Sequence, residues 1–167
     1  DAVLLACFGD PALFALRELA DAPVIGMAEA SCQAAAKFGR FSIVTGGERW
    51  RAMLEEFVGS IGYADRLAGI MTVAPTGGDI ARDPEASLVL LTDACRRAAQ
   101  EQKADAVILG GAGLAGLAAR IADRVPIPLI DSFEAVMLAG LALARAKPQK
   151  PARGTFAKTP AVETIAL

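Results

Sequence analysis

The stretch DAVILGGAG at residues 105–113 decides the fold, because the chain opens on a near copy of it, DAVLLACFG at residues 1–9. The match continues further along the chain, where PVIGMAEA at residues 23–30 corresponds to PLIDSFEA at residues 128–135. Each copy reads as a short apolar strand, a turn of small residues, a helix, a second strand and an acidic residue. Two copies of one unit predict two similar lobes that face each other across a cleft.

Strands that alternate with helices predict an α/β fold with parallel sheets, because right-handed βαβ units lay successive strands side by side in one direction. In such sheets, ligands bind at the carboxyl ends of the strands. Asp10 and Pro11 read as the N-cap and first residue of a helix. We expect strands at 2–6, 23–27, 41–45, 67–73, 106–109 and 127–131, and helices at 30–38, 84–102, 114–124 and 132–146. After the third strand, the spacing of apolar residues predicts a further amphipathic helix, which carries on one face Trp50, Met53, Leu54, Phe57 and Val58.

The repeat divides the chain into three expected parts. Residues 1–40 belong to the first lobe, and residues 41–104 form a second-lobe segment with a mobile loop at 74–83. Residues 105–167 carry the second repeat and a C-terminal wrap. Asp1 leads directly into an apolar strand, so we expect the polypeptide to extend further toward the N-terminus and to supply at least one more strand.

Composition and charge exclude several classes of protein. The formal net charge is −2 and no basic patch stands out, which argues against nucleic acid as a partner. No uncharged apolar run is long enough to cross a membrane, and the start lacks the pattern of a signal peptide. Three widely spaced cysteines indicate a reducing, cytoplasmic setting rather than a disulfide scaffold. Histidine is absent, which excludes Ser-His and Cys-His catalysis and His-ligated metals within this chain.

Cys7 is the first candidate for chemistry. It follows the apolar run of the first strand and precedes a predicted helix, where backbone N–H groups and the helix dipole stabilise a thiolate. A thiolate in such a place can act as a nucleophile or as a general base. The alternative is a small buried apolar residue, which is a common role for cysteine.

Glycine-rich turns at strand ends are the second kind of candidate. Gly110 to Gly113 resembles a phosphate-binding turn, but it lacks the spacing of a dinucleotide-binding motif and the lysine of a P-loop. Its N–H groups would bind a carboxylate equally well, or its small residues simply allow a helix to pack closely on the sheet. Thr45 and Gly46 lie at the end of another strand and form a weaker candidate of the same kind. Residues 76–79, Thr-Gly-Gly-Asp, lie in the long loop and could form a lid.

The remaining polar candidates have simpler interpretations. Cys95 lies on the apolar side of a predicted helix and is expected in the core, and Cys32 is expected to be structural. Glu29 and Glu134 occupy equivalent places in the two copies, where each could cap a helix, orient a turn or take part in catalysis.

Residues 6–11 and 23–30 resemble the first cysteine motif of the aspartate/glutamate/hydantoin racemase superfamily, and the hydantoin racemase branch is the most similar. Residues 106–114 resemble the second motif of the family, and residues 154–156 its tail. The resemblance implies two pseudo-symmetric, Rossmann-like lobes with the active site in the cleft between them, no cofactor and no metal. It also implies a pair of cysteines that remove and return the proton α to a carbonyl. Carried over to this chain, it assigns Cys7 as acid/base, with Phe8, Gly9, Thr45, Gly46, Gly111, Ala112 and Gly113 near the substrate.

Two departures from the family pattern shape the functional hypotheses. The second cysteine of the family falls on Gly111, either by natural divergence or by an engineered replacement, and the N-terminal strand with its Asn-containing loop is not in this chain. The leading hypothesis is a cofactor-independent racemase or epimerase of the hydantoin racemase type, which must recruit a second acid/base. The alternatives are a one-cysteine decarboxylase or lyase of the arylmalonate decarboxylase type, and a non-catalytic relative that binds small acids.

The expected partner is a small molecule such as a hydantoin, an amino acid, allantoin or a malonate derivative. Nucleic acid and membrane are not expected. The apolar Ala/Leu helices permit self-association, and the family often assembles, so a homo-oligomer is expected.

Overall fold

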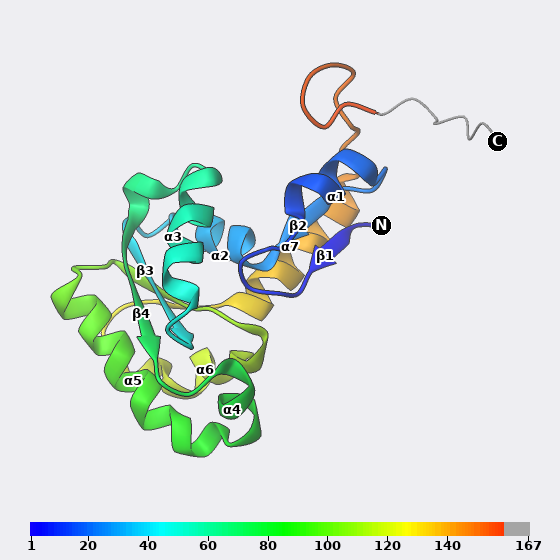
Figure 1. The fold of residues 1–167 in the computed structure, drawn as a ribbon. Coiled ribbons are helices and arrows are strands. Elements are labelled where there is room, and N and C mark those ends of the chain that lie inside the picture. The colour runs from blue at the N-terminus through cyan, green and yellow to red at the C-terminus, as the bar shows by residue number, and fades with distance from the viewer. Residues whose placement is uncertain (159–167) are drawn as a thin grey trace.

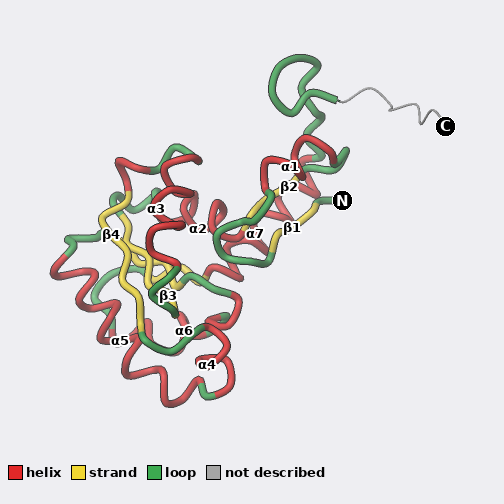
Figure 2. Tube along the Cα trace, in the orientation of Figure 1, coloured by secondary structure: helices red, strands yellow, loops and turns green. Residues whose placement is uncertain are grey.

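Two parallel sheets form the framework of the computed structural model, which describes residues 1–158 (Figures 1 and 2). In the smaller sheet, β1 (Val3–Leu5) pairs with β2 (Val24–Gly26). The larger sheet has the order β4-β3-β5-β6, and its strands are β3 (Phe41–Gly46), β4 (Leu67–Val73), β5 (Ala106–Leu109) and β6 (Leu129–Asp131). Every pairing is parallel, which confirms the predicted α/β class.

Helices connect these strands. They are α1 (Leu13–Leu19), α2 (Met27–Ala35), α3 (Trp50–Ser60), α4 (Gly77–Arg82), α5 (Pro84–Glu101), α6 (Leu117–Ile121) and α7 (Ser132–Ala146). Short 3₁₀ turns cover Ala64–Arg66, Ala112–Leu114 and Ala122–Arg124. In the part of the chain that the structure describes, no helix is both long and apolar enough to cross a membrane.

The larger sheet is covered on both faces. Along β5, Ala106 and Ile108 join an apolar cluster with α2, α3 and α7, whereas Val107 and Leu109 join a second cluster with α5 and α6. A strand that is buried on both faces carries apolar residues at every position. This is why an uninterrupted Ala-Val-Ile-Leu sequence forms a strand in the middle of the sheet.

The sequence repeat appears in the structure as two equivalent units, β1-α1-β2-α2 and β5-α6-β6-α7. The equivalent helices α2 and α7 pack against each other between the two sheets, so the two lobes meet along this helix pair (Figure 1). Helix α7 also lies close to β1, because a Cβ added at Gly140 would be 2.6 Å from the Leu4 Cδ1 atom. The predicted two-lobed architecture is thereby confirmed.

The likeness of the two units extends to their backbone. Ala12 and Gly116 each form the N-cap of the helix that follows the first strand, and both adopt the left-handed conformation with φ of 62° and 80°. The next residues, Leu13 and Leu117, are both buried. The helix after β1 therefore begins at Leu13 with Ala12 as its cap, and the prediction that Asp10 caps it is wrong.

Three other expected elements differ from the structure. The segment 74–83 is not all loop, since α4 forms within it. The helix expected at 114–124 is broken into a 3₁₀ turn, α6 and a second 3₁₀ turn, because Gly116 leaves the helical conformation. Helix α2 begins at Met27, three residues before the expected start, since the chain turns directly from strand to helix after Gly26.

The C-terminal wrap was expected after Lys147, in residues 148–167. The described part of it runs beside α1, where the rings of Phe156 and Phe14 stack with centroids 6.2 Å apart. The Nζ of Lys150 donates a hydrogen bond to the Glu18 carbonyl oxygen at 2.7 Å. Residues 159–167 lie outside the described residues.

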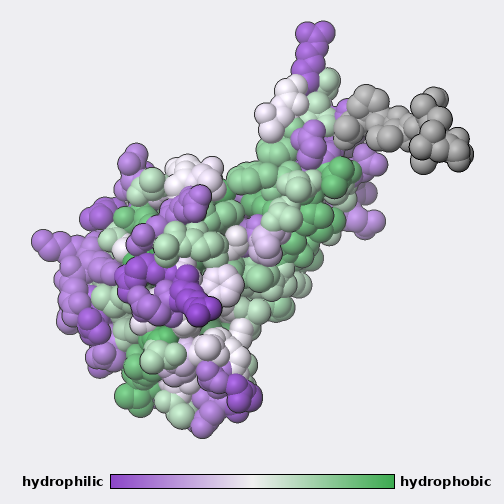
Figure 3. Space-filling view, in the orientation of Figure 1, coloured by the Kyte–Doolittle hydropathy of each residue, from purple (hydrophilic) through white to green (hydrophobic). Residues whose placement is uncertain are grey.

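The molecular surface is uneven in polarity. Figure 3 shows hydrophobic surface over the region of β1 and α7, whereas hydrophilic residues cover much of the larger lobe. Four large apolar side chains on α7 are between 41% and 60% exposed, namely Phe133, Met137, Leu138 and Leu141.

Candidate active site

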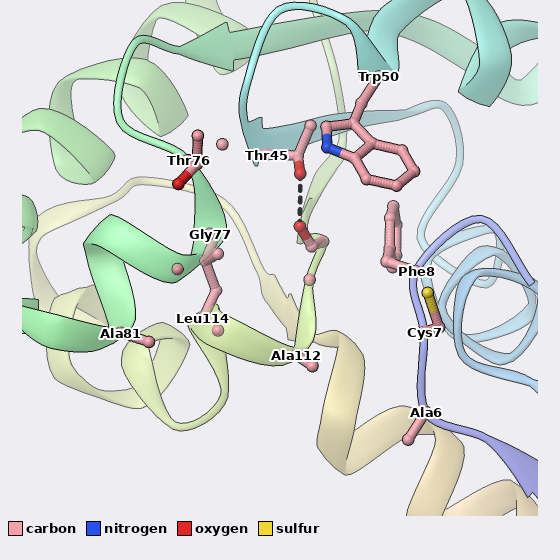
Figure 4. Close-up of a pocket in the computed structure, with 15 residues that line it drawn as sticks. Ala6, Cys7, Phe8, Thr45, Trp50, Thr76, Gly77, Ala81, Ala112 and Leu114 are labelled. Carbon is pink, nitrogen blue, oxygen red and sulfur yellow. Dashed lines mark hydrogen bonds between the residues drawn. The ribbon is translucent and has the colours of Figure 1, made fainter.

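A cavity of about 410 Å³ lies where the loops after β1, β3 and β5 meet the first turns of α3 and α4 (Figure 4). Ligands of parallel α/β folds bind at the carboxyl ends of the strands, and this cavity has that position. It is lined by Ala6, Cys7, Phe8, Thr45, Gly46, Trp50, Thr76, Gly77, Gly78, Ala81, Gly110, Gly111, Ala112, Gly113 and Leu114.

The cavity brings together most of the residues that the sequence singled out. Cys7 and Phe8 come from the first repeat, Thr45 and Gly46 from the end of β3, and residues 111–113 from the second repeat. Gly9 is not among the lining residues. It has φ of 104°, and a Cβ at this position would lie 2.7 Å from Met53 Cε. Gly9 is therefore needed for the turn and for its packing against α3.

Cys7 differs from the other two cysteines in its exposure. Its side chain is accessible, whereas Cys32 and Cys95 are buried, each in a different apolar cluster, as expected for structural residues. Burial raises the pKa of the Cys32 thiol well above its usual range, and the nearby Asp10 and Glu29 carboxylates add to the effect. Burial also raises the pKa of Cys95 to about 12. Both buried thiols stay protonated at neutral pH, so Cys7 is the cysteine available for chemistry.

Gly110 is a glycine because the ring of Phe8 occupies the space beside it. A Cβ at Gly110 would overlap the Phe8 ring. The peptide is also held on both sides, since Gly110 N–H donates to the Val44 carbonyl at 2.9 Å and Thr45 Oγ1 donates to the Gly110 carbonyl at 2.7 Å. Gly110 therefore allows the ring of Phe8, which belongs to the first repeat, to pack against the end of β5 beside the cavity.

The space beside Gly111 is large enough for a Cβ atom. A Cβ there would lie 3.3 Å from Leu114 Cδ1 and 4.0 Å from Thr45 Oγ1, which are ordinary or slightly tight contacts. Its φ of 141° is a conformation that favours glycine. The Gly111 N–H donates to Ser132 Oγ at 3.1 Å and is therefore already engaged.

The next two backbone N–H groups of this turn, those of Ala112 and Gly113, have no hydrogen-bond partner among the described residues. Both residues line the cavity. Free N–H groups on a cavity wall are suited to a carbonyl or carboxylate oxygen. The N–H groups of this turn that have no partner in the described residues are therefore those of residues 112–113, whereas the Gly111 N–H is bonded to Ser132.

The first turn of α4 forms a wall that was expected only as a possible lid. Thr76 and Asp79 form a complete capping box, in which Asp79 N–H donates to Thr76 Oγ1 at 3.2 Å and Thr76 N–H donates to the Asp79 carboxylate at 3.0 Å. A Cβ at Gly46 would lie 2.6 Å from the Pro75 carbonyl oxygen, and one at Gly113 would overlap the Gly77 backbone. The glycines of β3 and of the second repeat thus let α4 approach closely. The Thr-x-x-Asp spacing is the sequence signal that predicts this helix start.

Trp50 is a cavity residue that the sequence reasoning assigned only to an apolar helix face. It opens α3 directly after the Gly46-Gly47 turn and is 44% exposed. A Cβ at Gly47 would lie 3.2 Å from Trp50 Cδ1, so the indole rests on this glycine. Figure 4 shows the Trp50 nitrogen directed toward Thr45, and Phe8 lying near Cys7. The aromatic surface of the cavity comes from these two rings.

Asp10 does not cap α1 but takes part in a buried contact with α2. Its carboxylate accepts hydrogen bonds from Ala28 N–H at 2.9 Å and Glu29 N–H at 2.8 Å. Burial raises the pKa of Asp10 from 3.8 to about 6, although these two hydrogen bonds favour the ionised form. The neighbouring Glu29 is paired with Arg17 at 2.5 Å. Neither Glu29 nor Glu134 lines the cavity.

The raised pKa of Asp10 predicts a pH-dependent stability. Because the folded protein holds this proton more tightly than the unfolded chain, the stabilisation is complete below pH 3.8 and is lost as the pH rises to about 6. At about 1.4 kcal/mol per pH unit, the free energy of unfolding should fall by about 3 kcal/mol over this range relative to Asp10→Asn. Urea unfolding of both proteins between pH 4 and 7 measures the difference. Parallel pH profiles for the two proteins would contradict this assignment.

The described residues offer no cluster of three or more His, Cys, Asp or Glu side chains suited to a metal ion. The cavity instead presents one exposed thiol, two aromatic rings and backbone N–H groups without a partner in the described residues, and its two threonine hydroxyls, of Thr45 and Thr76, are bonded within the protein. Such a set can bind a small carbonyl compound and move a proton.

Comparison with known proteins places the chain in a family. Residues 1–139 match the family model described as Asp/Glu/Hydantoin racemase. The chain is 41% identical over 136 residues to a hydantoin racemase of Pseudomonas sp. (strain NS671), covering 81% of this chain and 55% of that protein. It is also 41% identical over 138 residues to a hydantoin racemase of Paenarthrobacter aurescens, covering 81% and 58%. The chain thus spans little more than half the length of these relatives.

A solved structure gives the same result for the fold. The allantoin racemase of Pseudomonas fluorescens superposes with a TM-score of 0.90 at 27% sequence identity, covering 99% of this chain and 71% of that one. The sequence motifs, the two-lobed fold and these matches agree. The chain belongs to the Asp/Glu/hydantoin racemase family.

Proposed function

We propose that the protein is a cofactor-independent racemase or epimerase that moves the proton on the carbon α to a carbonyl, in the manner of a hydantoin racemase. The observation that carries the proposal is that Cys7, the exposed thiol, borders a cavity whose opposite wall contains the second motif of the family. The substrate is a hydantoin or a related cyclic or carboxylate compound. The sequence relatives named as hydantoin racemases support this class.

In the proposed reaction, the Cys7 thiolate takes the α-proton, and the electron pair of the C–H bond moves into the carbonyl to give an enolate. In this proposal the N–H groups of Ala112 and Gly113, two residues that line the cavity, bind the enolate oxygen, since donors of this kind stabilise charge as it develops. The Cys7 thiol then returns a proton to the same carbon. This acid–base exchange needs no group from outside the chain on the face of the substrate that Cys7 contacts.

The opposite face is different, because Gly111 stands where the second acid/base of the family falls. A glycine cannot donate or accept a proton through a side chain, so protonation on that face must come from water or from a group outside this chain. We therefore expect exchange on the Cys7 face to be faster than inversion. The turn with Gly111 keeps its role in binding the substrate through Ala112 and Gly113.

The presence of one reactive thiol favours a second candidate, a decarboxylase or lyase. In that reaction a C–C bond breaks, CO₂ leaves, and Cys7 only protonates the resulting carbanion.

The two candidate functions give different products and can be distinguished by analysing them. We would incubate the protein with single enantiomers of 5-substituted hydantoins and, in parallel, with an arylmalonate. Loss of optical rotation without loss of mass supports the isomerase, and release of CO₂ from the malonate with an unchanged hydantoin would overturn it.

Trp50 gives a prediction about the substituent on the substrate. The indole supplies apolar surface at the rim of the cavity, so a bulky apolar group on the substrate can be buried against it. At about 25 cal/mol per Å² of apolar area, losing part of this contact costs about 1–2 kcal/mol. Trp50→Ala should therefore raise KM about tenfold for 5-benzylhydantoin, a change of about 1.4 kcal/mol. The matched control is 5-methylhydantoin, whose KM should change little, and equal changes for both substrates would contradict a wall role for Trp50.

We also infer a reducing setting and self-association for the protein. All three cysteines are free thiols, which supports a reducing compartment such as the cytoplasm. The exposed apolar side chains of α7 support the expected homo-oligomer.

A further inference from the structure

In each repeat, one carboxylate accepts hydrogen bonds from N–H groups at the start of the helix after the second strand. The carboxylate comes from the turn after the first strand in one repeat and from the end of the second strand in the other. In the first repeat, Asp10 lies in the turn that carries Cys7, and its carboxylate accepts from the N–H groups of Ala28 and Glu29 at the start of α2. In the second repeat, Asp131 lies at the end of β6. Its carboxylate accepts from Phe133 and Glu134 at the start of α7, at 2.9 and 3.1 Å.

The bonded N–H groups occupy equivalent places in the repeat, since residues 28 and 29 correspond to residues 133 and 134. Asp131 corresponds to Gly26, and Gly26 has no room for a side chain, because a Cβ there would overlap the Asp10 carboxylate. The Asp10 carboxylate therefore fills the place that the Asp131 side chain fills in the other repeat. Asp131 also reaches back to the turn after β5, where its second oxygen accepts from Gly116 N–H at 2.6 Å.

In both repeats, then, a carboxylate ties the turn at the end of the first strand to the helix after the second strand. In the first repeat this turn holds the thiol. Asp10 N–H donates to the Cys7 carbonyl at 3.0 Å, and Leu13 N–H donates to the Asp10 carbonyl at 3.1 Å. Asp10 itself has φ of 50°, a left-handed conformation that aspartate tolerates better than most residues. The backbone and the side chain of Asp10 together fix the path of the chain from Cys7 to α1.

We propose that Asp10 is a positioning residue for Cys7, whose buried carboxylate locks the thiol-bearing turn onto the N-terminus of α2. This inference rests on the proposed role of Cys7 as the acid/base. Asp10 does not line the cavity. It acts through the turn by holding the Cys7 backbone at a fixed distance from the opposite wall. Proton transfer demands such precision, because a displacement of about 1 Å can lower the rate about 100-fold.

The test compares Asp10→Ala with Asp83→Ala, which removes a helix cap of the same chemical kind from α5. Asp83 accepts from Ala86 N–H at 3.1 Å and is not a cavity residue. Both variants should melt at a lower temperature than the wild type. At a temperature where both are folded, Asp10→Ala should lower kcat for α-proton exchange about 10- to 100-fold with KM within about twofold, whereas Asp83→Ala should keep both constants. Equal kcat in the two variants would overturn the proposal.

A rescue variant uses the arrangement of the second repeat. In Asp10→Ala/Gly26→Asp, the new carboxylate would come from the end of β2, as Asp131 comes from the end of β6, and could bind Ala28, Glu29 and the Ala12 N–H. We expect most of the lost kcat to return. If the double variant recovers the melting temperature but not kcat, the positioning role is wrong.

Should Asp10→Ala not fold, Asp10→Asn takes its place, because it keeps one acceptor oxygen. It should give an intermediate kcat, and a wild-type kcat for this variant would count against the proposal.

A measurement that does not depend on catalysis distinguishes this inference from the proposed function. Amide hydrogen exchange at positions 10, 28 and 29 reports the turn and the start of α2 directly. Protection at position 10 should fall at least about tenfold in Asp10→Ala and stay unchanged in Asp83→Ala, with 1.4 kcal/mol for each factor of ten. A wild-type protein that moves no α-proton, combined with this loss of protection, would refute the function and leave the positioning intact. Unchanged protection at position 10 would refute the positioning.

Discussion

Replacing Cys7 by serine should reduce α-proton exchange on a hydantoin substrate by about 10²- to 10⁴-fold, the usual contribution of a general acid or base. Serine keeps the size and the polarity of the side chain, but its hydroxyl is far less acidic than a thiol and supplies almost no base at neutral pH. Cys7 is exposed on the wall of the cavity, so the substitution should leave the melting temperature nearly unchanged. The measurement is loss of the α-proton signal by NMR in D₂O.

The matched control for this variant is Cys95→Ala. Cys95 is a buried member of the apolar cluster beneath α5, so its loss should cost about 1 kcal/mol of stability and leave the exchange rate intact. Iodoacetamide gives a chemical version of the same test. It should label Cys7 in the folded protein, because Cys32 and Cys95 are buried, and it should stop the exchange. A Cys7→Ser protein that keeps full activity would remove the basis of the proposed mechanism.

Replacing Gly111 by cysteine should have the opposite effect and raise the rate of inversion by about 10²-fold or more, because it supplies an acid/base on the second face. There is room for the side chain, with 3.3 Å from the position of its Cβ to Leu114 Cδ1 and 4.0 Å to Thr45 Oγ1. The backbone must leave its φ of 141°, and strain of this kind costs about 1–3 kcal/mol, so the variant should melt at a lower temperature. Polarimetry with a single enantiomer measures the gain.

Gly111→Ala is the control for the strain, since it changes the backbone in the same way and adds no thiol. We expect this variant to lose stability like Gly111→Cys and to gain no inversion. Gly111→Cys should also become inactive on alkylation, as the wild type does through Cys7. An inversion rate for Gly111→Cys that equals that of Gly111→Ala would show that the second face of the substrate does not approach this turn.

The repeat made much of this fold predictable from the sequence. Short apolar runs such as Ala106–Leu109 are buried on both faces, and small residues at their ends leave space for a ligand, so the strands and the cavity residues follow from local pattern. Cys7, Thr45 and residues 111–113 were brought together for this reason. These residues line one cavity because the carboxyl ends of β1, β3 and β5, from two sheets, face the same space.

Other features depended on contacts between distant segments, which a local pattern does not contain. Asp10 followed by Pro11 has the local signature of a helix N-cap, yet its carboxylate binds α2, eighteen residues further along the chain. Gly9 and Gly110 were singled out from their motifs alone, whereas the structure shows that Met53 or Phe8 occupies the space beside each of them. Trp50 reads as a core residue from its spacing in α3, and only the meeting of α3 with the β3 turn exposes it in the cavity.

The segment at 74–83 carries a helix-start pattern within a composition typical of loops. Proline, glycine and aspartate made it read as a loop, whereas Thr76 and Asp79 have the spacing of a capping box and start a helix of one and a half turns. The buried Ile80 then anchors this helix in the second apolar cluster. A capping pattern followed by one buried apolar residue was sufficient for a short helix because the glycines facing it allow close packing.

The most direct test follows deuterium uptake and optical rotation together on single enantiomers of a 5-substituted hydantoin in D₂O, at a pH where the reaction without enzyme is slow. With an acid/base on one face only, Cys7 should exchange the α-proton for deuterium faster than the optical rotation decays. Cys7→Ser should abolish the deuterium uptake. Absence of uptake above the enzyme-free control would contradict the account, as would a rotation that decays from the start at the same rate as deuterium enters.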